Sequence, residues 1–124
     1  MDFSLSEDQQ AFADVAKSFA SDVFAPNAAE WDANHIFPKD ALKQAGELGF
    51  MGMYTPEEES GLGLPRLDSA IILEQLATGC TSTAAFISIH NMALNMIARY
   101  GTTEAKQTWC ADLVSGEKLA SYCL

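Results

Sequence analysis

The chain has 124 residues, of which 48% are hydrophobic and 19% are charged, and its formal net charge is −10. This length suits one compact domain, and the apolar content excludes an intrinsically disordered chain. The 7 basic residues are scattered along the sequence and form no run. Because an acidic protein repels phosphates and anionic lipid headgroups, we expect neither a nucleic acid nor a membrane as a partner.

The cysteines Cys80, Cys110 and Cys123 are widely spaced and form no Cys-x-x-Cys pair. This pattern favours reduced thiols in a core over a zinc or redox site. From Met1 onward, no basic region is followed by an apolar run. We therefore expect no secretory or transit signal, and we expect a cytoplasmic location.

The first expected helix begins at Ser6, because Ser6 and Gln9 have the spacing of a capping box. Apolar residues then recur at helical spacing from Phe12 to Val23. Pro26 ends or restarts this helix, because proline has no N–H to continue the hydrogen-bond ladder. A short helical continuation is expected over residues 27–34.

Pro38 suits the first turn of another helix, which we expect to run to residue 48 and to stop at Gly49. Proline and glycine then recur so often in residues 50–67 that the pattern predicts a structured loop. A short buried helix is expected over residues 70–77, and residues 78–81 break it.

Ser82 or Thr83 can cap the longest expected helix, which ends at Tyr100 and is closed by Gly101. Thr102 or Thr103 can cap a last helix that reaches about residue 114. Residues 120–124 differ, since Ser121-Tyr122-Cys123-Leu124 has strand-like side chains. A lone strand leaves its backbone unsatisfied, so we expect it to pair with another chain or the polypeptide to continue beyond Leu124.

These elements predict an all-α fold, an orthogonal or up-down bundle of about five to six helices. The helical domain is expected to cover residues 1–119, and a strand is expected to begin in residues 120–124.

The candidates for chemistry have plain structural alternatives. Glu57-Glu58-Glu59 lies in a Gly/Pro-rich loop, where a solvated tip is favoured over a pair of catalytic carboxylates. No cluster with metal-ligand spacing surrounds either histidine, so a metal site is not expected. His90 and Asn91 can orient a ligand or satisfy buried backbone groups, and the second role is favoured.

The helix over residues 83–99 is apolar nearly all round and must be central. Such a helix is usually only core. The small side chains of this helix, next to large ones, can equally shape a slot for an apolar ligand. The apolar pattern alone favours a helix that serves only as part of the core.

Separated motifs follow one another in the middle of the chain: Leu48-Gly49-Phe50-Met51-Gly52-Met53, Pro56-Glu57-Glu58, Gly61-Leu62-Gly63, and Leu67-Asp68 with Leu73-Glu74-Gln75-Leu76-Ala77. In this order they resemble the acyl-CoA dehydrogenase family, and residues 4–19 resemble its opening helix. Residues 77–83 and 87–92 resemble most the isobutyryl-CoA dehydrogenase branch. The chain departs from the family at Glu59 and Ser60, which replace an aromatic residue and a glycine and put the conformation of that loop in doubt.

The resemblance implies the amino-terminal domain of an FAD-dependent enzyme that dehydrogenates a short or branched acyl-CoA in fatty-acid or valine catabolism. A glutamate removes the α proton while FAD accepts hydride from the β carbon. The family carries that glutamate in a later helical domain, so no catalytic residue is expected in this chain, which should be inactive alone. Electron-transfer flavoprotein is the implied partner, and the implied assembly is a homo-oligomer, a tetramer in full-length members.

Site residues follow from the same resemblance. Tyr122, Cys123 and Leu124 match the start of the flavin-binding strand, and the resemblance implies that residues 120–124 are the first strand of a middle β domain that this chain lacks. The residues that match the helix lining the acyl pocket are Phe86, Ser88, Ile89 and Met92. Bulky side chains there would shorten the slot, which suits a short branched acyl chain. The alternative from another class is a non-enzymatic helical interaction module whose apolar face docks a partner.

Overall fold

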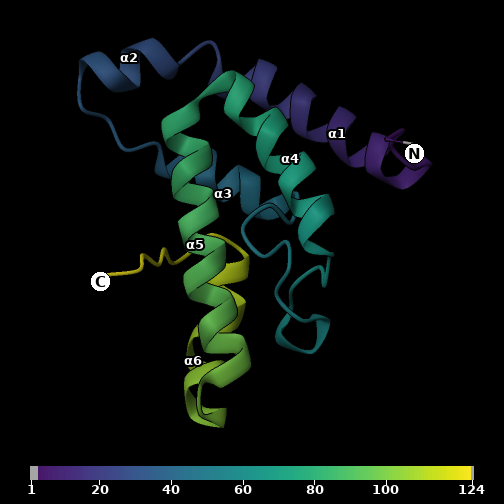
Figure 1. Ribbon diagram of the computed structural model, residues 1–124. Helices are drawn as coiled ribbons and strands as arrows, with labels where there is room; N and C mark the ends of the chain where they lie inside the picture. Colours follow the sequence, from purple (N-terminus) through teal and green to yellow (C-terminus); the bar gives the residue numbers. More distant parts are fainter. Residues whose placement is uncertain (1–2, 124) are drawn as a thin grey trace.

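In the computed structural model, which describes residues 3–123, every regular element is helical. The elements are α1 (Glu7–Phe19), the π-helical turn η1 (Ala20–Phe24), α2 (Ala28–Ala33), α3 (Lys39–Glu47), the 3-10 turn η2 (Glu57–Glu59), α4 (Arg66–Gly79), α5 (Thr81–Tyr100) and α6 (Thr103–Val114). Figure 1 shows α5 in the middle, with the two ends of the chain on opposite sides. The expected all-α bundle is confirmed.

The first helix starts where the capping box predicts. Ser6 Oγ accepts from the backbone N–H of Gln9, and the side chain of Gln9 accepts from the N–H of Ser6. Gln9 also donates to Asp68 at the start of α4, at 2.9 Å. At the other end of the two helices, a Cβ on Gly79 would lie 2.5 Å from the carbonyl oxygen of Ala20. The helices α1 and α4 therefore run in the same direction, and their far ends touch backbone to backbone.

The boundaries of α4 and α5 correct the expected ones. Pro65 lies at the N-cap of α4, which begins at Arg66 rather than at residue 70 and continues to Gly79. Gly79 stays helical, and the close approach of η1 leaves no room there for a side chain larger than that of glycine. Cys80 is the N-cap of α5, so the caps predicted at Ser82 or Thr83 are wrong. Thr102 does cap α6, through its hydroxyl and the N–H of Ala105.

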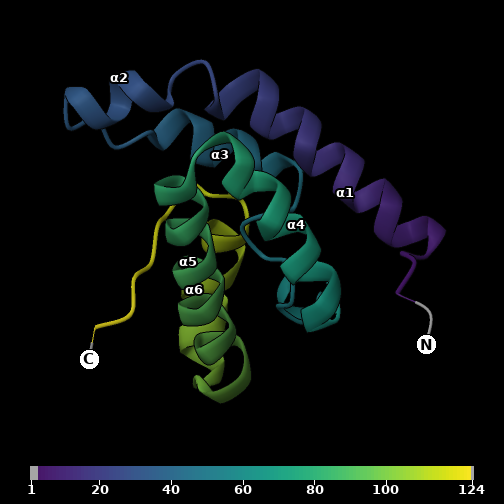
Figure 2. The same cartoon turned by 45° about the horizontal axis from the view of Figure 1, so that its top comes forward.

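Two adjoining clusters form the core. Aromatic and aliphatic side chains of α1, η1, α3, α4 and the loop after α3 surround the first half of α5, among them the fully buried Phe24, Leu42 and Leu76. The second half of α5 packs against α6 through Leu94 and Leu113. Figures 1 and 2 show α6 lying along that half of α5. Burying these groups is the main favourable term in folding.

The loop between α3 and α4 is structured, as predicted, and is held from inside by α5. Asn91 is fully buried and donates from Nδ2 to the carbonyls of Phe50 and Ile87, at 2.8 and 2.9 Å. Its Oδ1 accepts from the N–H of Met53 at 2.7 Å. Asn91 therefore satisfies buried backbone groups, the role favoured from the sequence.

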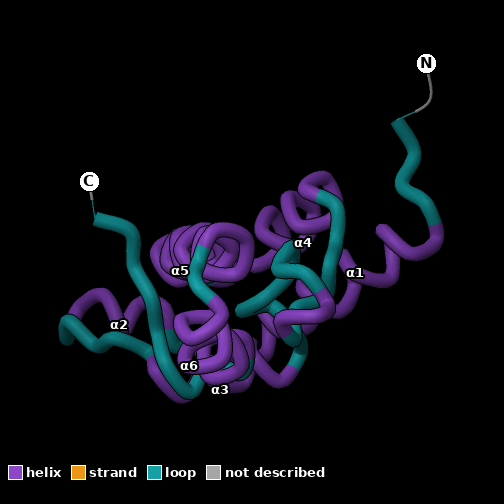
Figure 3. The backbone as a smooth tube through the Cα atoms, turned by 90° about the horizontal axis from the view of Figure 1, so that it is seen from below, coloured by secondary structure: helices purple, strands orange, loops and turns teal. Residues whose placement is uncertain are grey.

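After α6 the chain has no regular secondary structure, and Figure 3 shows residues 119–123 extending away from the helices. A strand is defined by hydrogen bonds to a neighbouring strand, and none is present in the described range. The strand at 120–124 and the domain boundary at residue 119 stay predictions, and Leu124 lies outside the described residues. Cys123 is exposed, so the expectation of three core thiols is wrong for this one.

Candidate functional site

One side of α5 carries an apolar surface that the rest of the described chain leaves uncovered. Ala85, Ile89, Met92 and Met96 recur at the spacing of one helical side. Ile89 is 38% exposed and Met96 is 41% exposed, and Met92 is partly buried. We call these four residues the α5 stripe. Large apolar side chains arrayed in this way mark a binding surface more often than isolated ones do.

The terminal segment, residues 119–123, leaves the domain beside this helix. The backbone N–H of Ala120 donates to Nδ1 of His90, the residue after Ile89, at 3.1 Å. Ala120 also packs against the cluster formed by α5 and α6. The segment therefore starts on the side of α5 that carries His90, about 100° around the helix from Ile89. Tyr122, 40% exposed, follows two residues later.

His90 itself is completely buried, and its Nε2 lies 2.9 Å from the carbonyl oxygen of Leu113 in the last turn of α6. Burial lowers the pKa of His90 below its ordinary value, while the hydrogen bond to the carbonyl of Leu113 acts in the opposite direction. The imidazole is therefore neutral at physiological pH and satisfies backbone groups, as was favoured from the sequence.

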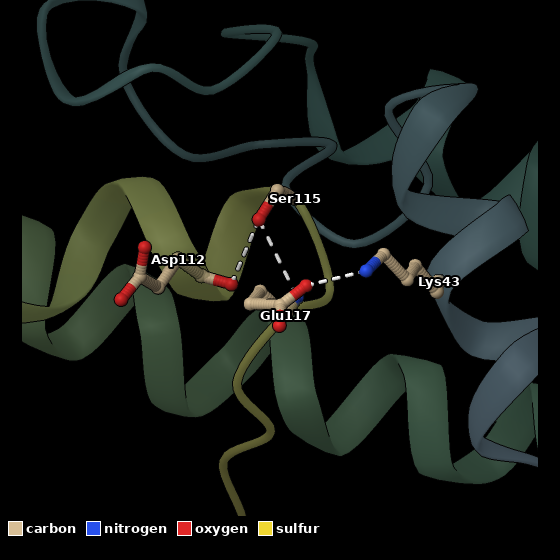
Figure 4. Close-up of polar contacts among 4 residues, drawn as sticks. All are labelled: Lys43, Asp112, Ser115 and Glu117. Carbon is tan, nitrogen blue, oxygen red and sulfur yellow. Dashed lines mark hydrogen bonds and ion pairs between the residues drawn. The ribbon is translucent and has the colours of Figure 1, made fainter.

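The turn that leads into the terminal segment is held against α3 (Figure 4). Lys43 Nζ lies 2.6 Å from a carboxylate oxygen of Glu117. Ser115 Oγ donates to the carbonyl of Asp112 and accepts from the N–H of Glu117. A Cβ on Gly46 would lie 2.1 Å from the carbonyl oxygen of Ser115, so α3 and the turn approach more closely than any side chain permits.

A cavity of about 300 Å³ lies between α2, the loop before α3 and the first turns of α5. Trp31, Phe37 and Phe86 contribute its aromatic walls. The rings of Phe37 and Phe86 meet edge to face at 4.9 Å. Asp32, His35 and Ser82 add polar groups at the edge.

The structure brings the predicted acyl-pocket residues together only in part. Ile89 and Met92 belong to the α5 stripe, with Ser88 beside them. Phe86 is turned about 60° away from Ile89 around the helix and faces the cavity near α2. None of the other three residues lines that cavity. From the sequence, Ala85 was already among the small residues of a possible slot. Met96 was not included, although the helical spacing of Met96 from Met92 was a sufficient signal.

The predicted flavin residues are placed where they can meet a ligand. Within residues 3–123, the backbones of Ser121, Tyr122 and Cys123 make no hydrogen bond to the rest of the chain. Their N–H and C=O groups are free to bind a cofactor or a neighbouring strand. The assignment of Tyr122 and Cys123 to a flavin site stays a prediction, and Leu124 lies outside the described residues.

Other site classes find no support in the described range. No group of three or more His, Cys, Asp or Glu side chains there could hold a metal ion. No helix in the same range is long and apolar enough to cross a lipid bilayer. The three consecutive glutamates form η2, and Glu59 lies 3.6 Å from Lys106 of α6. This ion pair gives one of the three carboxylates a structural role.

Comparison with known proteins places this geometry in a family. The family model described as the acyl-CoA dehydrogenase N-terminal domain matches residues 6–117. The mitochondrial isobutyryl-CoA dehydrogenase of Bos taurus is 50% identical over 97% of this chain, and the short-chain specific acyl-CoA dehydrogenase of the same organism is 40% identical over 97%. In each case the chain spans 29% of the relative's length.

A solved structure described as the electron transferring flavoprotein of Acidaminococcus fermentans contains a chain with the same fold. The TM-score is 0.87 at 35% identity, and the match covers 96% of this chain and 32% of the other. The family match extends from the cap of α1 to the turn after α6. This chain therefore belongs to the acyl-CoA dehydrogenase family and corresponds to the amino-terminal domain of that family.

Proposed function

We propose that the polypeptide carrying this domain is an FAD-dependent acyl-CoA dehydrogenase that forms the α,β double bond of a short or branched acyl-CoA. The observation that carries this proposal is the uncovered α5 stripe in a domain whose terminal segment has free backbone groups in the described range. Its apolar side chains suit an acyl chain, and the free backbone suits a polar cofactor. The 50% identity to isobutyryl-CoA dehydrogenase supports the substrate class.

The roles of individual residues follow from their positions. Ser88, Ile89 and Met92 are proposed to face the acyl chain, and Phe86 is proposed to close the slot from the neighbouring side of α5. Tyr122, Cys123 and Leu124 are proposed to contact FAD, whose chemistry when bound is the acceptance of a hydride. Leu124 is included only because of the family resemblance.

The remaining partners are proposals of the same kind. The glutamate that removes the α proton is proposed to lie outside residues 1–124, as in the family, so the isolated chain should have no activity. Electron-transfer flavoprotein is the proposed acceptor, and a homo-oligomer is the proposed assembly. The cytoplasmic location stays a prediction. The alternative of a non-enzymatic interaction module rests only on exposed apolar residues, which the enzyme explains equally well.

The direct test uses the whole polypeptide that carries this domain. Purified protein is expected to be yellow, and anaerobic addition of isobutyryl-CoA or butyryl-CoA should bleach its flavin absorption. The 124-residue chain is the comparison and should not dehydrogenate either thioester. A colourless full-length protein that binds no added FAD would refute the proposal. Turnover by the 124-residue chain alone would refute the placement of the base.

A separate variant tests which residues contact the acyl chain. Met92→Ala removes bulk from the α5 stripe. It is expected to raise the ratio of kcat/KM for hexanoyl-CoA to kcat/KM for isobutyryl-CoA about tenfold, which is the selectivity that one or more methylene groups give in an apolar pocket. Val15→Ala is the control, because Val15 is a 49% exposed apolar residue of α1. An unchanged ratio in the Met92 variant would remove Met92 from the proposed slot.

A further inference from the structure

His90 joins three parts of the molecule through one ring. The residue lies in the middle of α5, one nitrogen contacts the last turn of α6, and the other contacts the backbone of Ala120. Both contacts are to backbone groups, and the side chain has no exposed surface. Besides filling space in the core, this ring connects α5 to α6 and to the segment that follows α6.

The contacts determine which nitrogen carries the proton. The carbonyl of Leu113 can only accept a hydrogen bond, so Nε2 must donate to it. The N–H of Ala120 can only donate, so Nδ1 must be the unprotonated acceptor. The structure therefore requires the neutral Nε2–H tautomer. A proton on Nδ1 would face the N–H of Ala120 and break that bond.

Ala120 is also the last residue that the described chain holds in place by a hydrogen bond. Lys118 donates to the carbonyl of Asp112, Ala120 donates to His90, and the backbones of residues 121–123 have no partner in the described range. Tyr122 lies two residues beyond the clamp, at most about 7 Å along the chain. The direction in which Tyr122 leaves the domain therefore depends on the bond between Ala120 and His90.

We propose that His90 is a positioning residue, which clamps Ala120 through Nδ1 and so sets where the segment bearing Tyr122 and Cys123 leaves the helical domain. The part of this inference that concerns the flavin rests on the proposed function. No charged side chain in the described range contributes to the shift in the pKa of His90, because burial and the backbones of Leu113 and Ala120 are its only causes. The clamp therefore involves no ionic contact, and it adds to the packing of Ala120 against the α5–α6 cluster.

Two conservative variants separate the two contacts. Asparagine has an amide oxygen two bonds from Cβ, as Nδ1 is, so His90→Asn keeps an acceptor for Ala120. Glutamine has an amide nitrogen three bonds from Cβ, as Nε2 is, so His90→Gln keeps a donor for Leu113. Only the asparagine variant should retain the clamp, although both lose the ring.

NMR of the ¹⁵N-labelled 124-residue chain measures the clamp without any flavin. In the unmodified chain we expect the Nε2–H tautomer, and we expect the Ala120 amide to be protected from exchange. His90→Gln should increase exchange at Ala120 about fivefold to tenfold, as for the loss of one hydrogen bond, and should increase the motion of residues 121–123. His90→Asn should leave both near the original values. An Nδ1–H tautomer, or equal exchange at Ala120 in both variants, would overturn the clamp.

The full-length protein then tests the connection to the flavin. His90→Gln should lower the ratio of bound FAD to protein, measured from the visible spectrum, while His90→Asn should preserve it. Equal FAD content in the two variants would overturn the role of the clamp in cofactor binding. If the unmodified full-length protein binds no flavin, the proposed function fails, and the amide measurements still decide the clamp.

Discussion

Replacing Asn91 by alanine would test how the loop after α3 is fastened to α5. The side chain makes three buried hydrogen bonds, two as donor and one as acceptor. The carbonyl of Ile87 keeps its helical partner after the change. The carbonyl of Phe50 and the N–H of Met53 lose the only partner they have in the described range.

The cost can be worked from these two groups. Each buried backbone group left without a partner costs about 1 to 3 kcal/mol, and the lost side-chain volume adds a smaller amount. We therefore expect Asn91→Ala to lower the free energy of unfolding by about 3 to 5 kcal/mol. A domain of this size has a total stability of about 5 to 15 kcal/mol, so much of it would be lost.

Urea unfolding of the 124-residue chain, followed by tryptophan fluorescence and circular dichroism, measures this change. With an m-value of about 2 kcal/mol/M, the midpoint should fall by about 2 M. Asn95→Ala is the matched control: Asn95 lies one turn further along α5, and within residues 3–123 its Oδ1 accepts only from the side chain of Arg99. The control should cost about 1 kcal/mol. Equal midpoints for the two variants would refute the fastening role of Asn91.

Three further changes test single features of the fold. Burial lowers the pKa of folded His90 below its ordinary value of 6.5, so the unfolded chain takes up the proton first as the pH falls. The stability of the fold should therefore decrease below about pH 6.5. Thermal unfolding at several pH values should show this decrease in the unmodified chain and a shallower pH dependence in His90→Asn. Thr55→Val should raise stability by about 1 kcal/mol in urea unfolding, because the buried Thr55 hydroxyl has no hydrogen-bond partner in the described range; a loss of stability would contradict this. Ser60→Gly should raise it by about 0.5 to 1 kcal/mol, because Ser60 has a φ of 71°, and an unchanged midpoint would show that serine adopts this conformation without cost.

The Ser60 position also resolves the departure from the family pattern. From the sequence alone, Glu59 and Ser60 put the conformation of this loop in doubt, because they replace an aromatic residue and a glycine. In the structure, Ser60 takes the left-handed conformation that a glycine adopts freely, and Glu59 pairs with Lys106 of α6. The loop therefore keeps the turn without the glycine.

Local chemistry alone predicted the ends of several helices. The capping box at Ser6, the cap at Thr102 and the stop at Gly49 each depend on residues within one turn. The all-α class follows from apolar residues at helical spacing, and the family follows from motifs whose order needs no coordinates. The apolar character of α5 also identified the helix that carries the candidate site.

Contacts between distant segments decided the rest. Position 79 has no room for a side chain because η1 lies against it, and Asn91 acquires its role because the loop after α3 reaches it. Helical spacing alone separates Phe86 from the α5 stripe, but only the tertiary structure shows that the Phe86 side faces the cavity near α2. The tautomer of His90 depends on Leu113 and Ala120, which are 23 and 30 residues away in sequence. Hydrogen bonds and packing of this kind depend on which groups meet in space, and periodicity along one segment carries no information about its partner.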